Sequence, residues 1–254
     1  MMEKAAKPAT LRGVQGTIAI SEIFGPTVQG EGAVIGKPTV FVRTGGCDYR
    51  CSWCDSKFAV LPEFRSTWKR MPPEEVFAEV KKLSPRPIMV TLSGGNPALQ
   101  PLGELIRLGK AKGYCFAIET QGTVARDWFC ELDHLTLSPK PPSSGMETNW
   151  EKLSRCVEFS GPETETIMKV VIFNEWDYAY AREVDHRFPS VPMYLQVGND
   201  RPPGPEPADK TEPRIGELLE RYEWLAGKVV ADRWNEATVL PQLHVLVWGN
   251  KRGV

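Results

Sequence analysis

Short apolar runs alternate with amphipathic segments along most of this chain, and no other feature limits its possible folds as strongly. Alternation of this kind is typical of parallel strands joined by crossover helices. We therefore expect an α/β fold. The expected strands are Thr17–Ile23, Thr39–Arg43, Ile88–Leu92, Cys115–Glu119, Leu135–Leu137, Thr166–Phe173, Met193–Val197 and His244–Trp248. The expected helices are Pro73–Leu83, Pro101–Lys112, Glu175–Phe188 and Ile215–Ala226.

The length of the chain suits a single domain. Its 254 residues, 41% of them hydrophobic, are enough for one large α/β domain or two small ones. Because no repeat, long linker or sharp change of composition divides it, we expect a flexible N-terminal tail over residues 1–16 and one domain over residues 17–254. Residues 199–210, NDRPPGPEPADK, are too rich in proline and charge for a core and are expected to form a surface loop.

Charge and hydropathy exclude several classes of partner. The formal net charge is −1, so no excess of lysine and arginine is present to neutralise a phosphate backbone, and nucleic acid is not expected as a partner. No apolar run approaches the roughly 20 residues of a membrane span, and the N-terminus lacks the apolar region of a secretory signal. Six cysteines are too few for a disulfide scaffold, which favours a reducing compartment. We expect a cytoplasmic protein.

Three cysteines lie within eight residues of the segment GGCDYRCSWCDSKF, at positions 45 to 58. A structural zinc ion would need a fourth ligand, from a histidine or a distant cysteine. A 4Fe-4S cluster held by three thiolates would instead keep one iron open for a substrate or cofactor. Ordinary loop thiols are the third possibility. The clustered cysteines are Cys47, Cys51 and Cys54; the histidines are His134, His186 and His244; Cys115, Cys130 and Cys156 follow no pattern and are given no role.

A glycine pair follows an expected strand in the segment VTLSGGNPALQ, at positions 90 to 100. Gly94 and Gly95 have no side chain, so the backbone there can approach a ligand closely and offer its amide groups. The segment is therefore a candidate binding loop some forty residues beyond the cysteines.

Both segments resemble the radical S-adenosylmethionine superfamily. Its cluster motif has this cysteine spacing with an aromatic residue before the third cysteine, where this chain has Trp53, and its GGEP segment corresponds to residues 94–97, where Asn96 replaces the glutamate. Asn96 can accept a hydrogen bond without offering charge, or it is a turn residue before Pro97. The resemblance implies an incomplete (β/α) barrel of the radical S-adenosylmethionine type. It also implies that the open iron binds S-adenosylmethionine and that an electron donor such as flavodoxin triggers release of a 5′-deoxyadenosyl radical.

Further segments resemble the 7-carboxy-7-deazaguanine synthases of queuosine and deazapurine biosynthesis, and this resemblance covers nearly the whole chain after residue 17. It implies an enzyme that contracts the ring of 6-carboxy-5,6,7,8-tetrahydropterin to 7-carboxy-7-deazaguanine with loss of ammonia, using S-adenosylmethionine catalytically and requiring Mg²⁺. It also implies a homodimer. The segments are EIFGPTVQGEG at 22–32, FVRTGGC at 41–47, CDSKF at 54–58, IETQGT at 118–123, SPK at 138–140, YLQVGN at 194–199 and PQLHVLVWG at 241–249.

The same resemblance implies roles for particular residues. Cys47, Cys51 and Cys54 would hold the 4Fe-4S cluster, and Ser56 would ligate Mg²⁺. The residues implied for the S-adenosylmethionine site are Trp53, Cys54, Asp55, Gly95, Ser138, Pro139, Lys140 and Gln196. The residues implied for the substrate site are Val28, Gln29, Gly30, Arg43 and Ser93. No acid or base is assigned, because the radical is generated at the cluster.

Side-chain chemistry agrees with three of these roles, and each has a structural alternative. The guanidinium of Arg43 can bind a carboxylate through two hydrogen bonds, or it simply ends a strand. The amide of Gln29 can donate and accept, as a pterin edge requires, or it lies in a tight turn. The hydroxyl of Ser56 can serve Mg²⁺ when water and substrate complete the shell, or it bonds its own loop.

Three other polar residues have two readings each. Lys140 would meet the cofactor or be a solvated lysine in a proline-rich loop. Glu119 would orient a ribose or the substrate, or make a structural hydrogen bond. His244 falls within an expected apolar strand, where a core histidine is favoured over a catalytic base.

Two other functions stay open. A radical enzyme with another substrate, such as a glycyl-radical activating enzyme, would keep the cluster loop but give no meaning to Gln29, Arg43 and Ser56. A non-enzymatic module would use the cysteines to bind zinc for folding or for holding a partner.

Overall fold

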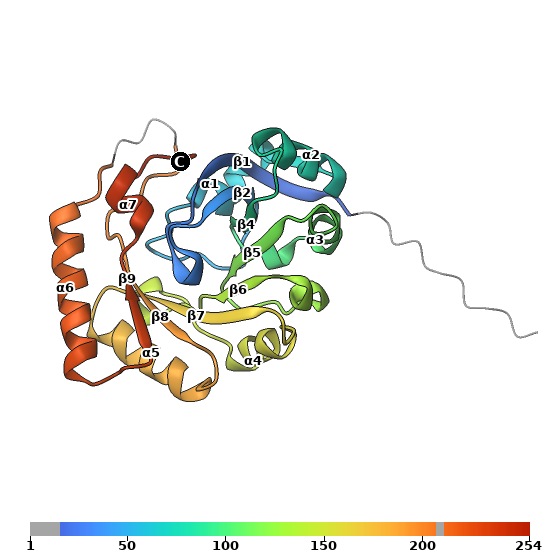
Figure 1. The fold of residues 1–254 in the computed structure, drawn as a ribbon. Helices are drawn as coiled ribbons and strands as arrows, with labels where there is room; N and C mark the ends of the chain where they lie inside the picture. Colours follow the sequence, from blue (N-terminus) through green and yellow to red (C-terminus); the bar gives the residue numbers. More distant parts are fainter. Residues whose placement is uncertain (1–15, 207–210) are drawn as a thin grey trace, which may run out of the picture.

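One curved sheet forms the centre of the molecule (Figure 1). The structure, a computed structural model, describes residues 16–206 and 211–254. Within these residues nine strands pair in the order β3-β1-β2-β4-β5-β6-β7-β8-β9. They are β1 Ile18–Val28, β2 Pro38–Thr44, β3 Lys69–Met71, β4 Met89–Gly94, β5 Cys115–Thr120, β6 His134–Leu137, β7 Glu165–Ile172, β8 Met193–Val197 and β9 Ala237–Leu240.

The strands from β2 onward run parallel in the sheet, and β1 and β3 add an antiparallel edge. The sheet does not close, because β3 and β9 are its two edges and no pairing joins them among the described strands. This open sheet agrees with the expected incomplete barrel. The carboxyl ends of the parallel strands meet on one side, where ligands bind in such folds.

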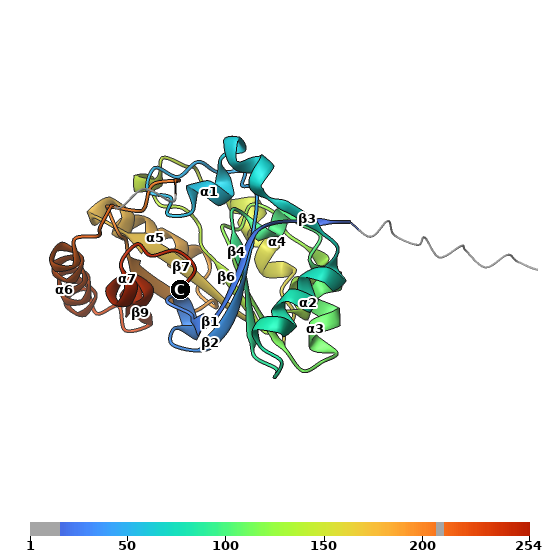
Figure 2. The same ribbon diagram turned by 90° about the horizontal axis from the view of Figure 1, so that it is seen from above.

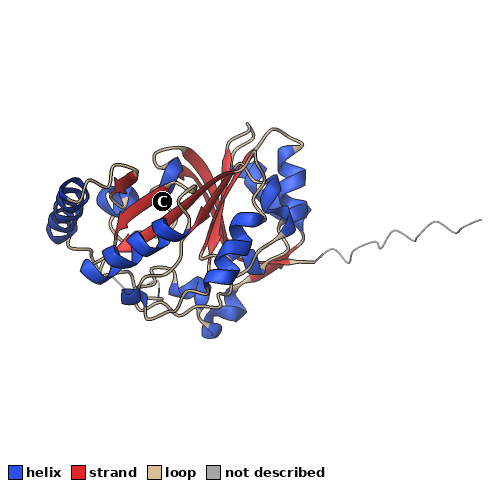
Figure 3. Ribbon diagram, turned by 90° about the horizontal axis from the view of Figure 1, so that it is seen from below, coloured by secondary structure: helices blue, strands red, loops and turns tan. Residues whose placement is uncertain are grey.

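Helices cover the outer side of the curve, as Figures 1 and 2 show for α2 to α6. Figure 3 shows the strands as a single twisted layer with helices around it. The core lies between this sheet and the outer helices, and includes Val90, Phe116 and Leu135 from the strands and Leu105 and Leu153 from the helices. The helices are α1 Lys57–Val60, α2 Pro73–Leu83, α3 Gly103–Lys110, α4 Trp150–Glu158, α5 Glu175–Arg187, α6 Ile215–Ala231 and α7 Leu243–Trp248.

Local signals explain where several helices begin. Helix α2 starts with Pro73, carries two glutamates in its first turn and ends with two lysines, which complements the helix dipole at both ends. The side chain of Asn149 accepts a hydrogen bond from Lys152 N at the start of α4, and that of Asn174 caps α5. Helix α2 has the predicted bounds, and α3, α5 and α6 overlap their predictions.

Two strands and two helices were not predicted, and one predicted strand is wrong. Strands β3 and β9 and helix α1 are short, and α4 buries only Leu153 and Cys156 fully. Residues 244–248 belong to α7 and not to a strand. An apolar run of this length fits either structure, and only Val245 of α7 is buried.

Predictions about the ends of the chain are tested in part. Residues 1–15 of the expected tail lie outside the described residues, as do residues 207–210 of the expected loop. The described part of that loop has no regular secondary structure, as predicted. No helix in the described ranges is long and apolar enough to cross a membrane.

Candidate active site

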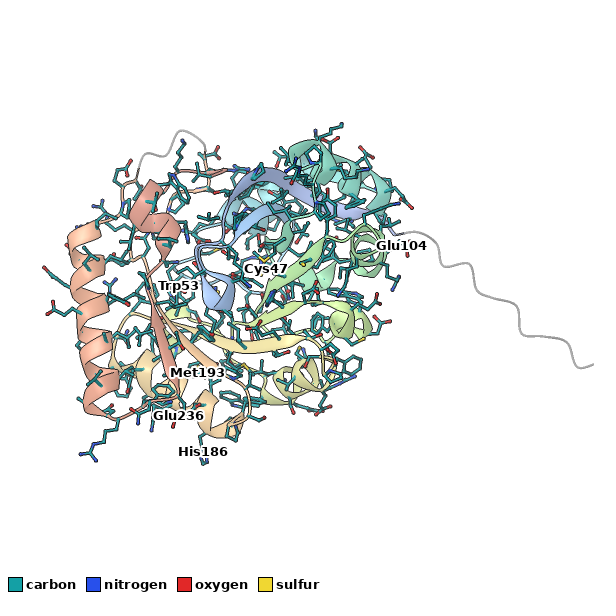
Figure 4. The ribbon with its side chains drawn as sticks, in the orientation of Figure 1. Cys47, Trp53, Glu104, His186, Met193 and Glu236 are labelled. Carbon is teal, nitrogen blue, oxygen red and sulfur yellow. The ribbon has the colours of Figure 1, made fainter. Side chains whose placement is uncertain are left out.

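The carboxyl ends of the parallel strands surround a cavity of about 740 Å³. Residues at or just beyond these ends line it: Arg43 on β2, Ser93 on β4 and Gly95 just after it, Glu119 on β5, and Lys140 after β6. The last residues of the chain, 248–254, close another side. In Figure 4, Cys47 and Trp53 lie in the middle of the molecule, whereas Glu104, His186 and Glu236 lie at its edge.

The three clustered cysteines all line this cavity and are half-buried. Burial raises the pKa of each thiol, that of Cys54 to about 12. Thiolates at these positions therefore need a positively charged centre close by, which an iron-sulfur cluster supplies. No three His, Cys, Asp or Glu side chains in the described part of the chain converge on a single ion.

The glycine pair brings strand β4 against the cluster loop. A Cβ on Gly95 would lie 2.5 Å from the carbonyl carbon of Gly46 and 3.0 Å from the oxygen of Ala59. Gly94 has φ +126°, and a Cβ there would meet the backbone of Thr44. The absence of side chains thus allows two backbone segments to pack together, beside the cavity that Gly94 and Gly95 also line.

Asn96 is fully buried and makes hydrogen bonds within the protein. Its Oδ1 accepts from Ala98 N at 3.1 Å and from Thr120 Oγ1 at 2.7 Å, and its Nδ2 donates to Asp48 Oδ1 at 2.9 Å. Gln121 Nε2 donates to the same oxygen of Asp48 at 2.6 Å and lies 3.5 Å from Cys47 Sγ. Asn96 therefore caps the 3-10 helix Pro97–Leu99 and also holds the cluster loop, and its role towards the cofactor stays a prediction.

Arg43 and Ser56 form a hydrogen-bonded group at one side of the cavity. Arg43 Nε pairs with Glu22 Oε1 at 2.7 Å, and its Nη1 donates to Ser56 Oγ at 3.1 Å. Ser56 Oγ donates to Asp55 Oδ1 at 2.6 Å, so the reading in which Ser56 bonds its own loop describes this structure. Arg252, near the C-terminus, pairs with Glu22 Oε2 at 2.8 Å and adds a second guanidinium.

Buried charges line another side of the cavity. Lys169 on β7 pairs with Glu119 at 2.6 Å and with Glu31, and Gln29 Nε2 donates to Glu119 Oε1 at 3.0 Å. Gln29 Oε1 accepts from Gly30 N, so both ends of the Gln29 amide are already bonded within the protein. Each end of the amide keeps one further donor or acceptor position, and Gln29 lines the cavity, so its role towards the substrate stays a prediction.

The comparisons with known proteins agree with this geometry. Residues 41–171 match the Radical SAM superfamily. The chain is 49% identical over 243 residues to the 7-carboxy-7-deazaguanine synthase of Bacillus subtilis, which covers 93% of this chain and 98% of that protein. It is 45% identical over 241 residues to the enzyme of the same name from Bacillus cereus, covering 93% of this chain and 99% of that one. The chain belongs to the 7-carboxy-7-deazaguanine synthase family.

The fold agrees with that of a solved structure. The crystal structure of QueE from Escherichia coli superposes with a TM-score of 0.65, covering 90% of this chain and 95% of that one at 20% identity. As a 7-carboxy-7-deazaguanine synthase of the radical S-adenosylmethionine superfamily, this chain is an enzyme, and its superfamily implies a 4Fe-4S cluster and S-adenosylmethionine.

Unpartnered polar atoms fit the binding of such groups. Ser93 Oγ is buried beside the cavity with no hydrogen-bond partner in residues 16–206 or 211–254. Gln196 is fully buried, and neither polar atom of its side chain has a partner in these ranges. Because buried polar groups are costly when unsatisfied, Ser93 Oγ, which lies at the cavity, is suited to bind a ligand. Lys140 Nζ donates to Ser138 O at 2.8 Å, and burial lowers its pKa, so the reading as a solvated lysine is wrong.

The cavity gathers nearly all the residues that the sequence implies for the site. Pro139 and Gln196 are buried but are not among the described residues that line it. The lining residues among the predicted ones are Val28, Gln29, Gly30, Arg43, Cys47, Cys51, Trp53, Cys54, Asp55, Ser56, Ser93, Gly95, Ser138 and Lys140.

Several lining residues were not predicted. His244 is half-buried on α7 and lines the cavity, so the expected core histidine in a strand is wrong. A Cβ on Gly30 would collide with the ring of His244, so the glycine allows this approach. Lys169 and Glu31 were missed, although a lysine within an apolar strand is itself a signal of a buried charge network. Arg252 gave no signal in the sequence.

Proposed function

We propose that this enzyme converts 6-carboxy-5,6,7,8-tetrahydropterin into 7-carboxy-7-deazaguanine with loss of ammonia. The identity of 49% to the Bacillus subtilis synthase over 93% of the chain is the observation that carries the proposal. When bound, the cluster and S-adenosylmethionine supply a 5′-deoxyadenosyl radical, and S-adenosylmethionine is used catalytically. The protein orients the substrate and excludes water around it.

The cavity's chemistry supports this substrate. The guanidinium of Arg43, which bonds Glu22 and Ser56, places positive charge on the side of the cavity proposed for the substrate carboxylate. The carboxylate of Glu119 is on β5, two strands from β2 in the sheet order, and it pairs with Lys169 on β7. A pterin with a carboxylate at one end and amine donors at the other matches these two sides. Ser93 and the backbone of Val28, Gln29 and Gly30 complete the proposed substrate site.

Ser56 is proposed to ligate Mg²⁺ that also meets the substrate carboxylate. Its Oγ lines the cavity beside the carboxylate of Asp55, and magnesium prefers such oxygen donors while keeping several waters. The hydroxyl would exchange its present bond to Asp55 for the ion.

The cluster and S-adenosylmethionine sites are proposed on the residues around the cysteine loop. Cys47, Cys51 and Cys54 would hold the cluster. Residues proposed for S-adenosylmethionine are Trp53, Cys54, Asp55, Gly95, Ser138, Pro139, Lys140 and Gln196. The ring of Trp53 lies under Lys140 Nζ at 5.9 Å, and Ser138 is buried beside it.

Other expectations from the sequence are also proposals. We propose a single domain from residue 17 onward, a homodimer, a flavodoxin-like electron donor, a cytoplasmic location and no nucleic-acid partner. Sedimentation of the reconstituted enzyme would test the dimer.

The function is tested by anaerobic reconstitution followed by incubation with reductant, S-adenosylmethionine, Mg²⁺ and the pterin. We expect 7-carboxy-7-deazaguanine by mass spectrometry, and none from a Cys51→Ala variant. Iron and sulfide with no product from this pterin would favour a radical enzyme for another substrate. Zinc near one ion per chain, without iron or sulfide, would favour the binding module.

A further inference from the structure

A lysine interrupts the buried strand β7. The side chain of Lys169 is 3% exposed, and its strand neighbours Met168 and Val170 belong to the hydrophobic core. Since side chains alternate across a strand, Lys169 projects to the opposite face, where it lines the cavity. A buried ammonium is costly unless it is paired and hydrogen-bonded, so its partners determine what it does.

Two carboxylates pair with this ammonium. Lys169 Nζ donates to Glu119 Oε2 at 2.6 Å and to Oε2 of Glu31. Glu119 belongs to β5, and Glu31 precedes a short turn of 3-10 helix over Gly32–Val34. Two carboxylates and one ammonium leave one net negative charge at the cavity wall.

Two glutamines fix the outer oxygens of these carboxylates. Gln29 Nε2 donates to Glu119 Oε1 at 3.0 Å, and Gln242 Nε2 donates to Glu31 Oε1 at 2.8 Å. Each carboxylate oxygen can accept more than one hydrogen bond, so each keeps acceptor capacity. The exposed fraction of the side chain is 14% for Glu31 and 23% for Glu119, against 3% for Lys169. The carboxylates, and not the ammonium, are what the cavity offers to a ligand.

The other charged groups that face this network are His244 on α7, whose Nδ1 lies 3.9 Å from Glu31 Oε1, and Lys140 after β6. Burial would raise the pKa of Glu31, but Lys169 and then His244 outweigh it and lower the pKa to about 2. Burial would lower the pKa of Lys169, but Glu119 and Glu31 raise it. Glu31 and Lys169 are therefore charged at neutral pH.

We propose that Lys169 is a positioning residue that holds Glu31 and Glu119 side by side as two ionised acceptors for the donor-rich amino-pyrimidinone edge of a pterin-like substrate. The proposal rests on the proposed function and deepens it. The ammonium keeps the carboxylates ionised, and it sets the spacing between them. Without it, two neighbouring carboxylates would share a proton and draw together.

The test measures binding of 6-carboxypterin, an oxidised analogue of the substrate, to the reconstituted enzyme with S-adenosylmethionine and without reductant. The variants are Lys169→Met, which removes the charge, and Lys169→Arg, which keeps it. Lys228→Met is the matched control, because Lys228 lies on α6, pairs with Glu175 and Asp232, and is not among the lining residues. Binding is followed by ligand fluorescence from pH 6 to 9, and circular dichroism checks the fold of each variant.

We expect Lys169→Met to weaken binding by roughly tenfold or more, because one partner of a buried charge network is lost. The pH dependence of its affinity should also show a step that the wild type lacks, at the pH where Glu31 and Glu119 lose the proton that they share. Lys169→Arg keeps the positive charge beside Glu31 and Glu119, so a step seen in Lys169→Met and absent from Lys169→Arg isolates the effect of that charge. Lys169→Arg should lack the step, and Lys228→Met should match the wild type.

Three results would overturn the proposal. Lys169→Met could bind like the wild type, or it could bind more weakly by the same factor at every pH, which would make Lys169 merely structural. Lys169→Arg could share the new ionisation step. If Lys169→Met does not fold, Glu31→Gln replaces it: unchanged affinity in that variant refutes the paired acceptors, and weakened affinity supports them. If the wild type binds neither 6-carboxypterin nor 7-carboxy-7-deazaguanine, the proposed function itself is wrong.

Discussion

Replacing Gly95 with alanine should separate two backbone segments that the active site needs in contact. The new methyl group would lie 2.5 Å from the carbonyl carbon of Gly46, closer still to its oxygen, and 3.0 Å from Ala59 O. Non-bonded carbon atoms are most stable at about 3.5 to 4.0 Å, so the cluster loop must move by about 1 Å.

The cost of this movement follows from the hydrogen bonds that hold the loop. Asn96 N donates to Gly46 O at 2.8 Å, and Gly46 N donates to Ala59 O at 2.8 Å. Each is worth about 1 kcal/mol, so we expect the free energy of unfolding to fall by about 2 kcal/mol. Because misplacing reacting groups by about 1 Å can cost about 100-fold in rate, turnover should fall by a comparable factor.

Urea unfolding of the metal-free protein, iron and sulfide content after reconstitution, and the rate of product formation measure these effects. The matched control is Gly227→Ala in α6, where an added Cβ meets no atom within 4 Å. That variant should gain up to about 1 kcal/mol from helix propensity and keep its turnover. If Gly95→Ala unfolds and turns over like the wild type, the close packing of these segments is not needed and the reasoning fails.

Four further predictions concern the same region. Ser56→Ala should lower turnover and its dependence on Mg²⁺ while iron and sulfide contents stay normal; an unchanged magnesium response would remove Ser56 from the metal site. Asn96→Glu should reduce cluster loading, because a carboxylate would face Asp48 where the amide now donates at 2.9 Å, and equal iron content would contradict this. Arg252→Ala should raise KM by roughly tenfold and lower the free energy of unfolding by less than about 1 kcal/mol, since Arg252 lies at the cavity, 3.4 Å over the ring of Phe58. An unchanged KM in steady-state kinetics would contradict this. The ionised carboxylate of Glu31 stabilises the fold fully above its unfolded pKa of 4.5, and this contribution is lost as pH falls towards its folded pKa of about 2. The difference in unfolding free energy between the wild type and Glu31→Gln should therefore shrink below pH 4.5. A difference that is constant with pH would contradict this.

The sequence predicts best what is determined locally. The bounds of α2 follow from Pro73 and from charges that lie within a few residues of its ends. The cysteine spacing and the glycine pair are also local, and both lie at the cavity as expected. The apolar run at 244–248 failed as a strand because five residues do not distinguish the two periodicities, and the choice depends on a contact with Gly30 far away in the chain.

The network around Lys169 could not be predicted in this way, because its members come from separate parts of the chain. Glu31 and Gln242 are 211 residues apart in sequence and 2.8 Å apart in the structure. Parallel strands bring such residues together only after the order of the strands in the sheet is known. Ser56 shows the same limit: the bond to its neighbour Asp55 in its own loop was one of two readings, whereas its bond to Arg43, 13 residues away, was not predicted.

The open sheet explains why the last residues of the chain line the cavity. Its two edges are not paired, so the side between β9 and β1 needs another element to close it. The C-terminal segment does this: Leu243 N donates to Gly30 O at 3.0 Å, and Arg252 pairs with Glu22 on β1. Figure 1 shows this segment, in red, beside the blue strands β1 and β2. Because Glu22 pairs with Arg252 and Arg43 at once, docking of the C-terminal segment and orientation of Arg43 are linked through one carboxylate.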